Sequence, residues 1–149
     1  MPSFIQIRKR WADEDVVQAT VTVADGVSTH VNSAYLSLDW FGETAKGLHV
    51  FSRQIYGGLF NMEAGMEGPE YADGYFAARL HWFAPSRLLI NTKQQSDFFS
   101  FKGREVAAEA TFYLSTEPAL LDRFIGELDR VHEGKSDEAN LECVPLHVT

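Results

Sequence analysis

The feature that most constrains the fold is the strict alternation of apolar and polar residues in the segment VVQATVTV, residues 16–23. Val17, Ala19, Val21 and Val23 fall on one side of an extended chain, and the residues between them are Gln and Thr. A period of two predicts a β-strand with one buried face. The tripeptide ADG that follows is typical of a tight turn, so we expect a hairpin here.

Similar patterns on both sides of this strand extend it into a meander. Within residues 3–11, Ile5 and Ile7 alternate with polar residues, and residues 27–38 place Ala34, Leu36 and Leu38 on one face. Successive strands joined by short turns predict an antiparallel sheet.

The period changes at about Gly42, where apolar residues recur every three or four positions up to Ile55. This spacing predicts an amphipathic helix. Asp39 is a candidate N-cap for this helix, and Gly57 and Gly58 are candidates for its end.

The second half of the chain looks like the first in architecture, although the two halves do not align as a sequence repeat. Its strand-like segments are residues 75–83, 87–94, 98–101 and 105–114. An amphipathic helix follows over residues 118–131, with Pro118 in its first turn and Ser115 or Thr116 as its cap.

Together these elements predict an α+β domain, in which an antiparallel β-sheet of about six strands has two helices packed on one face. The expected order is three strands, a helix, a long loop, four strands and a second helix. We expect one domain in residues 1–134, because 149 residues with 45% hydrophobic content suffice for a single core. Residues 135–149 are expected to form a polar tail, either mobile or with one short terminal strand.

Charge and cysteine content restrict the classes of function. The net charge is -8, which disfavours binding to nucleic acid or to an anionic membrane. A single cysteine, Cys143, excludes an intrachain disulfide and fits a reducing compartment. Because the chain has no long apolar segment and no secretory signal pattern, the expected location is the cytoplasm. We expect no cofactor.

The segment NMEAGMEGPEYADGY, residues 61–75, combines carboxylates with glycines and contains no basic residue. Its carboxylates lack the spacing of a calcium-binding loop, and carboxylates would repel a phosphate, so we predict no metal site and no phosphate site. We interpret the segment as a long loop that contacts an unidentified protein partner. The expected contact residues are Tyr56, Phe60, Glu63, Glu67, Glu70, Tyr71, Asp73 and Tyr75.

The segment that follows is basic, and it supports an alternative function. With aromatic residues nearby, a basic sheet face is typical of single-stranded nucleic-acid binding. The residues of this alternative basic face are Arg79, His81, Arg87 and Lys93. A second alternative is a small-ligand carrier or an enzyme, with Glu67, Glu70 or Asp73 acting beside Arg79 or His81. We predict no catalytic residues, because the sequence has no Gly-x-Ser-x-Gly motif and Cys143 lies in the expected tail.

Residues 75–83 carry apolar side chains on both faces of the expected strand. Such a strand is either covered on both sides or contributes an exposed apolar patch. We therefore predict at least a weak homodimer.

The order of elements from Asp39 to Val131, with the segments YFAARLHW and EVAAEATFYLSTEPALLDRFIGEL, resembles small bacterial domains of unknown function. Some of these domains occur among the immunity proteins of polymorphic toxin systems. The resemblance implies a small intracellular protein that binds another protein, and it assigns no functional residue. We therefore expect a non-catalytic protein-binding domain, of an immunity or regulatory type.

Overall fold

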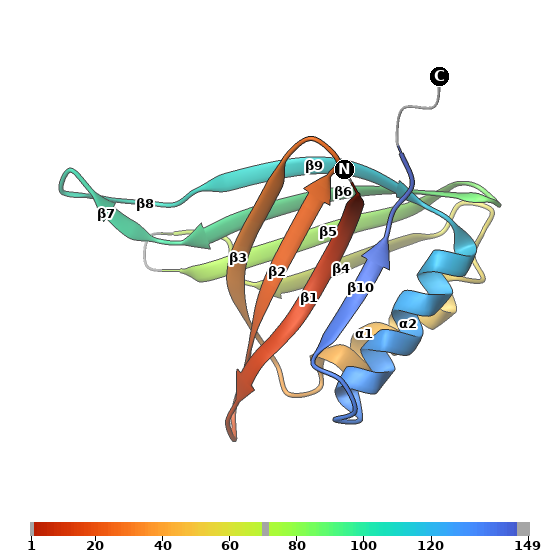
Figure 1. Cartoon of the computed structure of the whole chain (residues 1–149), viewed down its shortest axis with the longest axis horizontal. Coiled ribbons are helices and arrows are strands. Elements are labelled where there is room, and N and C mark those ends of the chain that lie inside the picture. Colours follow the sequence, from red (N-terminus) through yellow and green to blue (C-terminus); the bar gives the residue numbers. More distant parts are fainter. Residues whose placement is uncertain (1, 70–71, 146–149) are drawn as a thin grey trace.

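The computed structural model describes residues 2–69 and 72–145, which form two helices, two four-stranded antiparallel sheets and a two-stranded ribbon (Figure 1). The predicted α+β class and antiparallel pairing are confirmed. The helices are α1 (Trp40–Phe51) and α2 (Pro118–His132). The strands are β1 (Ser3–Ala12), β2 (Val17–Asp25), β3 (Thr29–Leu36), β4 (Leu59–Gly65), β5 (Asp73–Ala84), β6 (Arg87–Asp97), β7 (Phe99–Phe101), β8 (Arg104–Val106), β9 (Glu109–Thr116) and β10 (Glu138–Glu142).

The expected single sheet is wrong, because each half of the chain gives its last strand to the sheet of the other half. β4 follows α1 but pairs with β5, and β10 follows α2 but pairs with β1. Sheet A therefore has the order β10-β1-β2-β3, and sheet B has the order β4-β5-β6-β9. Alternation of apolar residues predicts which face of a strand is buried, but it does not predict which distant strand will pair with it.

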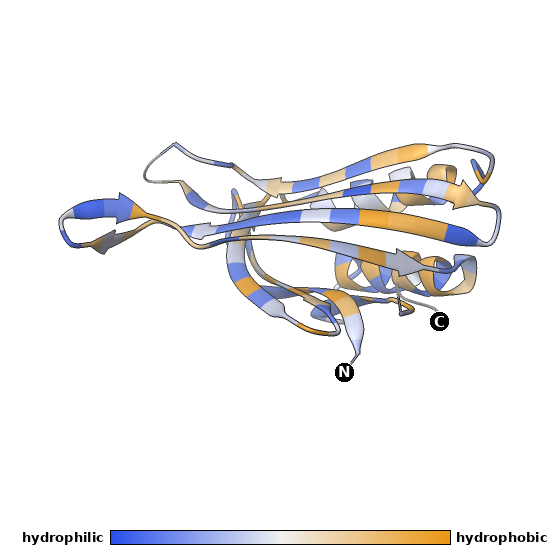
Figure 2. Cartoon of the chain, turned by 90° about the horizontal axis from the view of Figure 1, so that it is seen from above, coloured by the Kyte–Doolittle hydropathy of each residue, from blue (hydrophilic) through white to orange (hydrophobic). Residues whose placement is uncertain are grey.

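Sheet B forms one layer of the molecule, and sheet A and the two helices form the other. Figure 2 looks down on sheet B, with sheet A and the helices on its far side. α1 contacts α2 and β4, and α2 contacts β10. Side chains from both sheets and both helices share one core, in which Ile5, Phe51, Phe76 and Phe124 are almost fully buried.

Strands occur in the segment predicted as a long loop and in the predicted tail, for which a short terminal strand was one of two expected alternatives. The expected loop over residues 61–74 begins inside β4 and ends inside β5, so the connection is only residues 66–72. The expected tail contains β10, where Ala139 and Leu141 are fully buried beside β1. The packed domain therefore continues beyond residue 134.

Both helices begin near their expected positions; the N-cap residue is the predicted one for α1 but not for α2. Asp39 occupies the N-cap position of α1, yet its side chain makes no capping hydrogen bond. Glu117, rather than Ser115 or Thr116, occupies the N-cap position of α2. Thr116 lies in β9 and donates a hydrogen bond from Oγ1 to the carbonyl oxygen of Glu142 at 2.7 Å. Its hydroxyl thus joins the end of sheet B to β10.

Polar side chains join the two sheets where β3 runs across β5 and β6 (Figure 1). Gln94 Nε2 donates to Asn32 Oδ1 at 2.8 Å and to the carbonyl oxygen of His30 at 3.2 Å. Asn32 Nδ2 in turn donates to the carbonyl oxygen of Tyr75 at 3.1 Å. Because these groups are shielded from water, the network specifies how sheet A sits on sheet B.

In the part of the chain that the structure describes, neither helix is both long and apolar enough to cross a bilayer.

Candidate functional site

The side of sheet B that faces away from the core is an open surface built from four strands. Successive residues of a strand point to opposite faces, and here the even-numbered residues are mostly buried. We call the opposite surface the outer face. It consists of the odd-numbered residues from 59 to 65, 73 to 83, 87 to 97 and 109 to 113. Within residues 2–69 and 72–145 no helix or further sheet covers it, although the β4–β5 connection contacts one end.

Strand pairing aligns four hydrogen-bonding side chains across the outer face. Asn61 pairs with Arg79, Arg79 with Asn91, and Asn91 with Tyr113. We call these four residues the polar row. Tyr113 is 60% exposed, so its ring lies on the surface rather than in the core.

The adjacent positions form a row that is mainly apolar. Leu59 pairs with His81, and His81 pairs with Leu89. Phe83 follows at a bulge in β5 and is 71% exposed. We call Leu59, His81, Phe83 and Leu89 the apolar row. Together the two rows place apolar and aromatic side chains next to the guanidinium group of Arg79 and the imidazole ring of His81.

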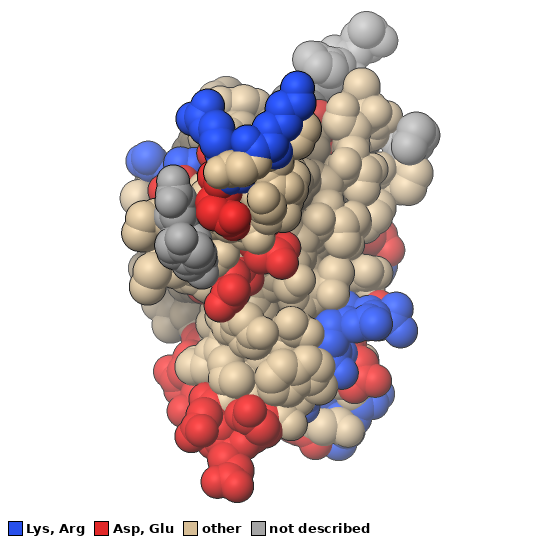
Figure 3. All heavy atoms as spheres, turned by 90° about the vertical axis from the view of Figure 1, so that its left-hand side faces the viewer, with Lys and Arg blue, Asp and Glu red and all other residues tan. Residues whose placement is uncertain are grey.

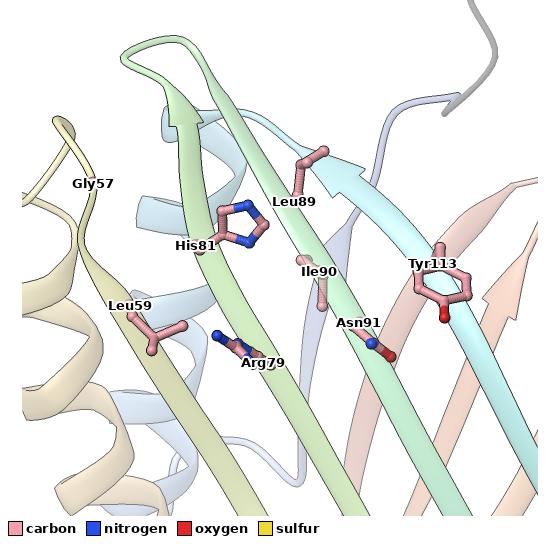
Figure 4. Close-up of a pocket in the computed structure, with 8 residues that line it drawn as sticks. All are labelled: Gly57, Leu59, Arg79, His81, Leu89, Ile90, Asn91 and Tyr113. Atoms are coloured by element: carbon pink, nitrogen blue, oxygen red, sulfur yellow. The ribbon is translucent and has the colours of Figure 1, made fainter.

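A shallow groove of about 500 Å³ lies over these rows (Figure 4). In Figure 4, Leu59, Arg79, His81 and Tyr113 project from three different strands toward this groove. A wide, shallow groove on a sheet fits a protein surface better than it encloses a small molecule.

The other end of the outer face is acidic. Asp73 and Asp97 are directly opposite each other on β5 and β6, and Glu109 and Glu63 lie on the two outer strands. With Glu67 from the β4–β5 connection, these residues form what we call the acidic end. The outer face is therefore polarised, with carboxylates toward one end of the strands and Arg79, His81 and Arg87 toward the other.

The Glu63 carboxylate, at the acidic end, is held in place by a hydrogen bond from another side chain. Tyr75 Oη donates a hydrogen bond to Glu63 Oε2 at 2.9 Å. Burial, together with this hydrogen bond to an anion, raises the pKa of Tyr75 to about 12. Trp40 Nε1 donates to the carbonyl oxygen of Glu63 at 2.8 Å, which ties α1 to the same position of β4.

The β4–β5 connection folds back onto the outer face. Glu67 forms an ion pair with Lys93, and this pairing raises the pKa of Lys93. The backbone nitrogen of Gly68 donates to Gln95 Oε1 at 2.7 Å. Residues 66–69 are therefore held against β6.

The structure separates the residues expected for the acidic partner-binding surface. Glu63, Glu67, Asp73 and Tyr75 lie at the acidic end of the outer face or are hydrogen-bonded there. Tyr56 is 88% exposed in the connection between α1 and β4, next to the groove residue Gly57. Phe60 is half-buried on the inner side and packs on Phe51. Glu70 and Tyr71 lie outside the described residues.

The four residues of the alternative basic face all lie on the outer face. Arg79 and His81 belong to the two rows, and Lys93 is paired with Glu67. Arg87 Nη1 donates to Ser115 Oγ at 3.3 Å. The acidic and basic sets that the sequence suggests for two different functions thus share one surface.

Sequence reasoning missed five residues of the two rows, which lie on β4, β6 and β9. The signal was available, because odd-numbered residues alternate with apolar even-numbered ones in these strands. The local pattern does not show, however, which strands pair to bring these residues next to β5. The missed residues are Leu59, Asn61, Leu89, Asn91 and Tyr113.

The described residues offer little for nucleophilic or metal chemistry. Burial raises the pKa of the Cys143 thiol to about 12, which keeps it protonated at neutral pH. Among residues 2–69 and 72–145, no three His, Cys, Asp or Glu side chains gather closely enough to hold a metal ion.

The ribbon of β7 and β8 projects beyond the body as a continuation of the β6–β9 hairpin (Figure 1, Figure 2). Phe99 and Phe101 on this ribbon are 50% and 57% exposed. Figure 3 views the molecule from this end, with the basic ribbon tip at the top and the acidic β1–β2 turn at the bottom. Lys102 and Arg104 are at the tip.

Comparison with protein-family models, curated proteins and solved structures finds no match to this chain. The resemblance to small bacterial domains therefore stays a prediction.

Proposed function

We propose that this chain is a non-catalytic protein-binding domain that uses the outer face of sheet B as its contact surface. The observation that carries the proposal is the open face itself, on which apolar and aromatic side chains stand beside Arg79. Tyr, Phe and Arg supply much of the binding energy at protein interfaces. Partner binding would cover the side chains that the fold leaves exposed.

The outward side of sheet A is polar along β2, while its exposed apolar side chains, Trp11, Val31 and Tyr35, stand on β1 and β3. Its central strand β2 presents Gln18, Thr20 and Thr22 outward. Sheet B presents Leu59, Leu89 and Phe83 in the apolar row of its outer face, and two of these are about half exposed or more. Grouped exposed apolar side chains mark interaction sites more often than isolated ones do.

The acidic end fits the same role. Carboxylates at the edge of an apolar contact act mainly through orientation and association rate. A protein that blocks a toxin or regulates an enzyme needs such a surface and needs no chemistry of its own. An immunity or regulatory role is therefore our proposed biological setting.

Single-stranded nucleic acid is the second candidate partner, and the placement of Arg79, His81, Arg87 and Lys93 on one sheet face favours it. Against it stand the five carboxylates of the acidic end on the same surface and the net charge of -8. A nucleic acid partner requires salt-dependent oligonucleotide binding that weakens when Arg79 and Arg87 are replaced.

Photo-crosslinking from matched positions tests the proposal. Tyr113 and Tyr35 both stand in Tyr-Leu-Ser segments on an edge strand, one of sheet B and the other of sheet A. With a photo-reactive phenylalanine at Tyr113, we expect one or a few defined cross-linked proteins. The same group at Tyr35 should not capture them.

A second experiment tests whether the cross-link from Tyr113 depends on the outer face. The substitution Leu89→Asp, in the chain carrying the photo-reactive group at Tyr113, should abolish the cross-link without changing the circular dichroism spectrum. Identical products from Tyr113 and Tyr35, or products unaffected by Leu89→Asp, would show that the outer face is not a binding surface.

A further inference from the structure

Arg79 is a charged side chain of the outer face that stands beside the apolar row. Among the described residues the ion pairs include Lys93 with Glu67 but none with Arg79. Its cross-strand neighbours are Asn61 and Asn91, which are neutral. Among the described residues, no carboxylate therefore has to be displaced before an anionic group of a partner binds this guanidinium group.

We infer that the partner presents a carboxylate side chain to Arg79 and an apolar side chain to the adjacent apolar row. This inference rests on the proposed function and names the chemistry of the surface that is recognised. A guanidinium group flanked by amides offers several hydrogen-bond donors to one carboxylate. The amides of Asn61 and Asn91 can donate from either side of Arg79.

The distance between the polar row and the apolar row indicates how the side chains of a matching partner segment are spaced. Arg79 and His81 are two residues apart on β5, which separates the rows by about 6.8 Å. An extended partner segment has the same distance between side chains at positions i and i+2. A strand with an acidic residue at i and Leu, Ile or Val at i+2 would therefore match Arg79 and the Leu59–Leu89 pair together.

The polarity of the outer face favours a polypeptide over a nucleic acid. Beyond Arg79 toward the acidic end, Lys93 is already paired with Glu67, and Asp73 and Asp97 follow. A strand of phosphates continuing in that direction would meet carboxylates, which repel it. A segment with one carboxylate followed by apolar or basic residues meets no such repulsion.

Two matched peptides test the inference with the full chain. The first is fluorescein-labelled Gly-Ser-Glu-Ser-Leu-Ser-Gly, in which Glu and Leu fall at i and i+2. The second has Gln in place of Glu. By fluorescence anisotropy at low salt, we expect the Glu peptide to bind about tenfold more tightly than the Gln peptide.

Substitutions show where this preference comes from. Arg79→Gln should remove the difference between the peptides, while Arg8→Gln on sheet A should preserve it. Moving Leu next to Glu should weaken binding, because the two side chains would then point to opposite sides of an extended peptide. Equal affinity of the two peptides, or a preference that survives Arg79→Gln, overturns the inference. So does tighter binding of an oligothymidine that depends on Arg79.

The outcomes separate the two proposals. A partner captured at Tyr113, with no preference for the Glu peptide, would leave the binding function intact and overturn the carboxylate contact. A preference for the Glu peptide without any captured protein would support recognition by Arg79 and contradict the binding function.

Discussion

Gly74 of β5 lies directly against the backbone of Ser33 in β3. A Cβ atom added to Gly74 would stand 1.8 Å from the carbonyl oxygen of Ser33, and Gly74 has a φ of 104°. The two sheets therefore meet backbone to backbone, which only a residue without a side chain allows.

Replacing Gly74 with Ala should destabilise the fold strongly. The added methyl group would force the sheets apart, and the positive φ would be strained, so we expect a loss of about 3 kcal/mol or more in the free energy of unfolding. Denaturant titration measures this loss. The control Gly126→Ala, in the exposed face of α2 with open space around it, should raise stability slightly. An unchanged midpoint for Gly74→Ala would contradict the close contact.

Leu141→Ala tests whether β10 belongs to the core. Leu141 is fully buried in sheet A, so its truncation should lower the free energy of unfolding by about 2–5 kcal/mol. Glu142→Ala, at an exposed position of the same strand, should have little effect. If residues 135–149 were a mobile tail, the two substitutions would be equally harmless.

Gln94→Met should loosen the contact between the sheets. The substitution keeps the length of the side chain but removes the donor to Asn32 and to the carbonyl oxygen of His30. Because those acceptors stay buried, we expect a loss of about 1 kcal/mol in the free energy of unfolding. Gln18→Met, on the outward side of sheet A, serves as the control. Equal unfolding midpoints for the two variants would show that the network contributes nothing.

His30 should make stability depend on pH. Burial lowers its pKa below the ordinary value of 6.5, so the unfolded chain takes up a proton at a higher pH than the folded protein. This contribution to stability is present above pH 6.5 and is lost as the pH falls toward the lower folded value. Urea titrations at about pH 7.5 and about pH 5.5 should therefore differ less for His30→Gln than for the original chain. An identical pH dependence in both chains would rule out this role for His30.

The projecting ribbon should be dispensable for folding. Its strands pair with each other and expose Phe99 and Phe101, so they contribute little to the core. Replacing residues 97–107 with Asn-Gly should join β6 to β9 by a tight turn and change stability by less than about 1 kcal/mol. Calorimetry checks the unfolding temperature. A large decrease would mean that the ribbon packs on the body of the protein.

Local patterns predicted the individual elements well where one face of an element is buried. β2 follows the alternation of Val17, Val21 and Val23, and α2 follows the apolar spacing that includes Leu121 and Phe124. β4 was missed although Met62 and Ala64 alternate with exposed residues, because Gly65 and the acidic, glycine-rich residues that follow it favoured a loop. In the prediction for this segment, its glycine and acidic residues counted for more than the short alternation of buried and exposed residues that indicates a strand.

The candidate site was predictable only as separate residues. The sequence drew attention to Arg79 and to the carboxylates, but the protein-binding and nucleic-acid interpretations assigned them to different surfaces. Their common surface depends on β4 pairing with β5 and on β9 pairing with β6. Such pairings join residues far apart in the chain, and no local pattern encodes them.

Because β10 is synthesised last and pairs with β1, sheet A can be completed only when nearly the whole chain has been made. β1 leaves the ribosome early, but its partner β10 is completed only at Glu142. At the usual rate of translation, β1 waits on the order of ten seconds with one edge unpaired. During that time its backbone donors and acceptors are open to other strands, so we expect nascent chains to depend on chaperones more than their size suggests.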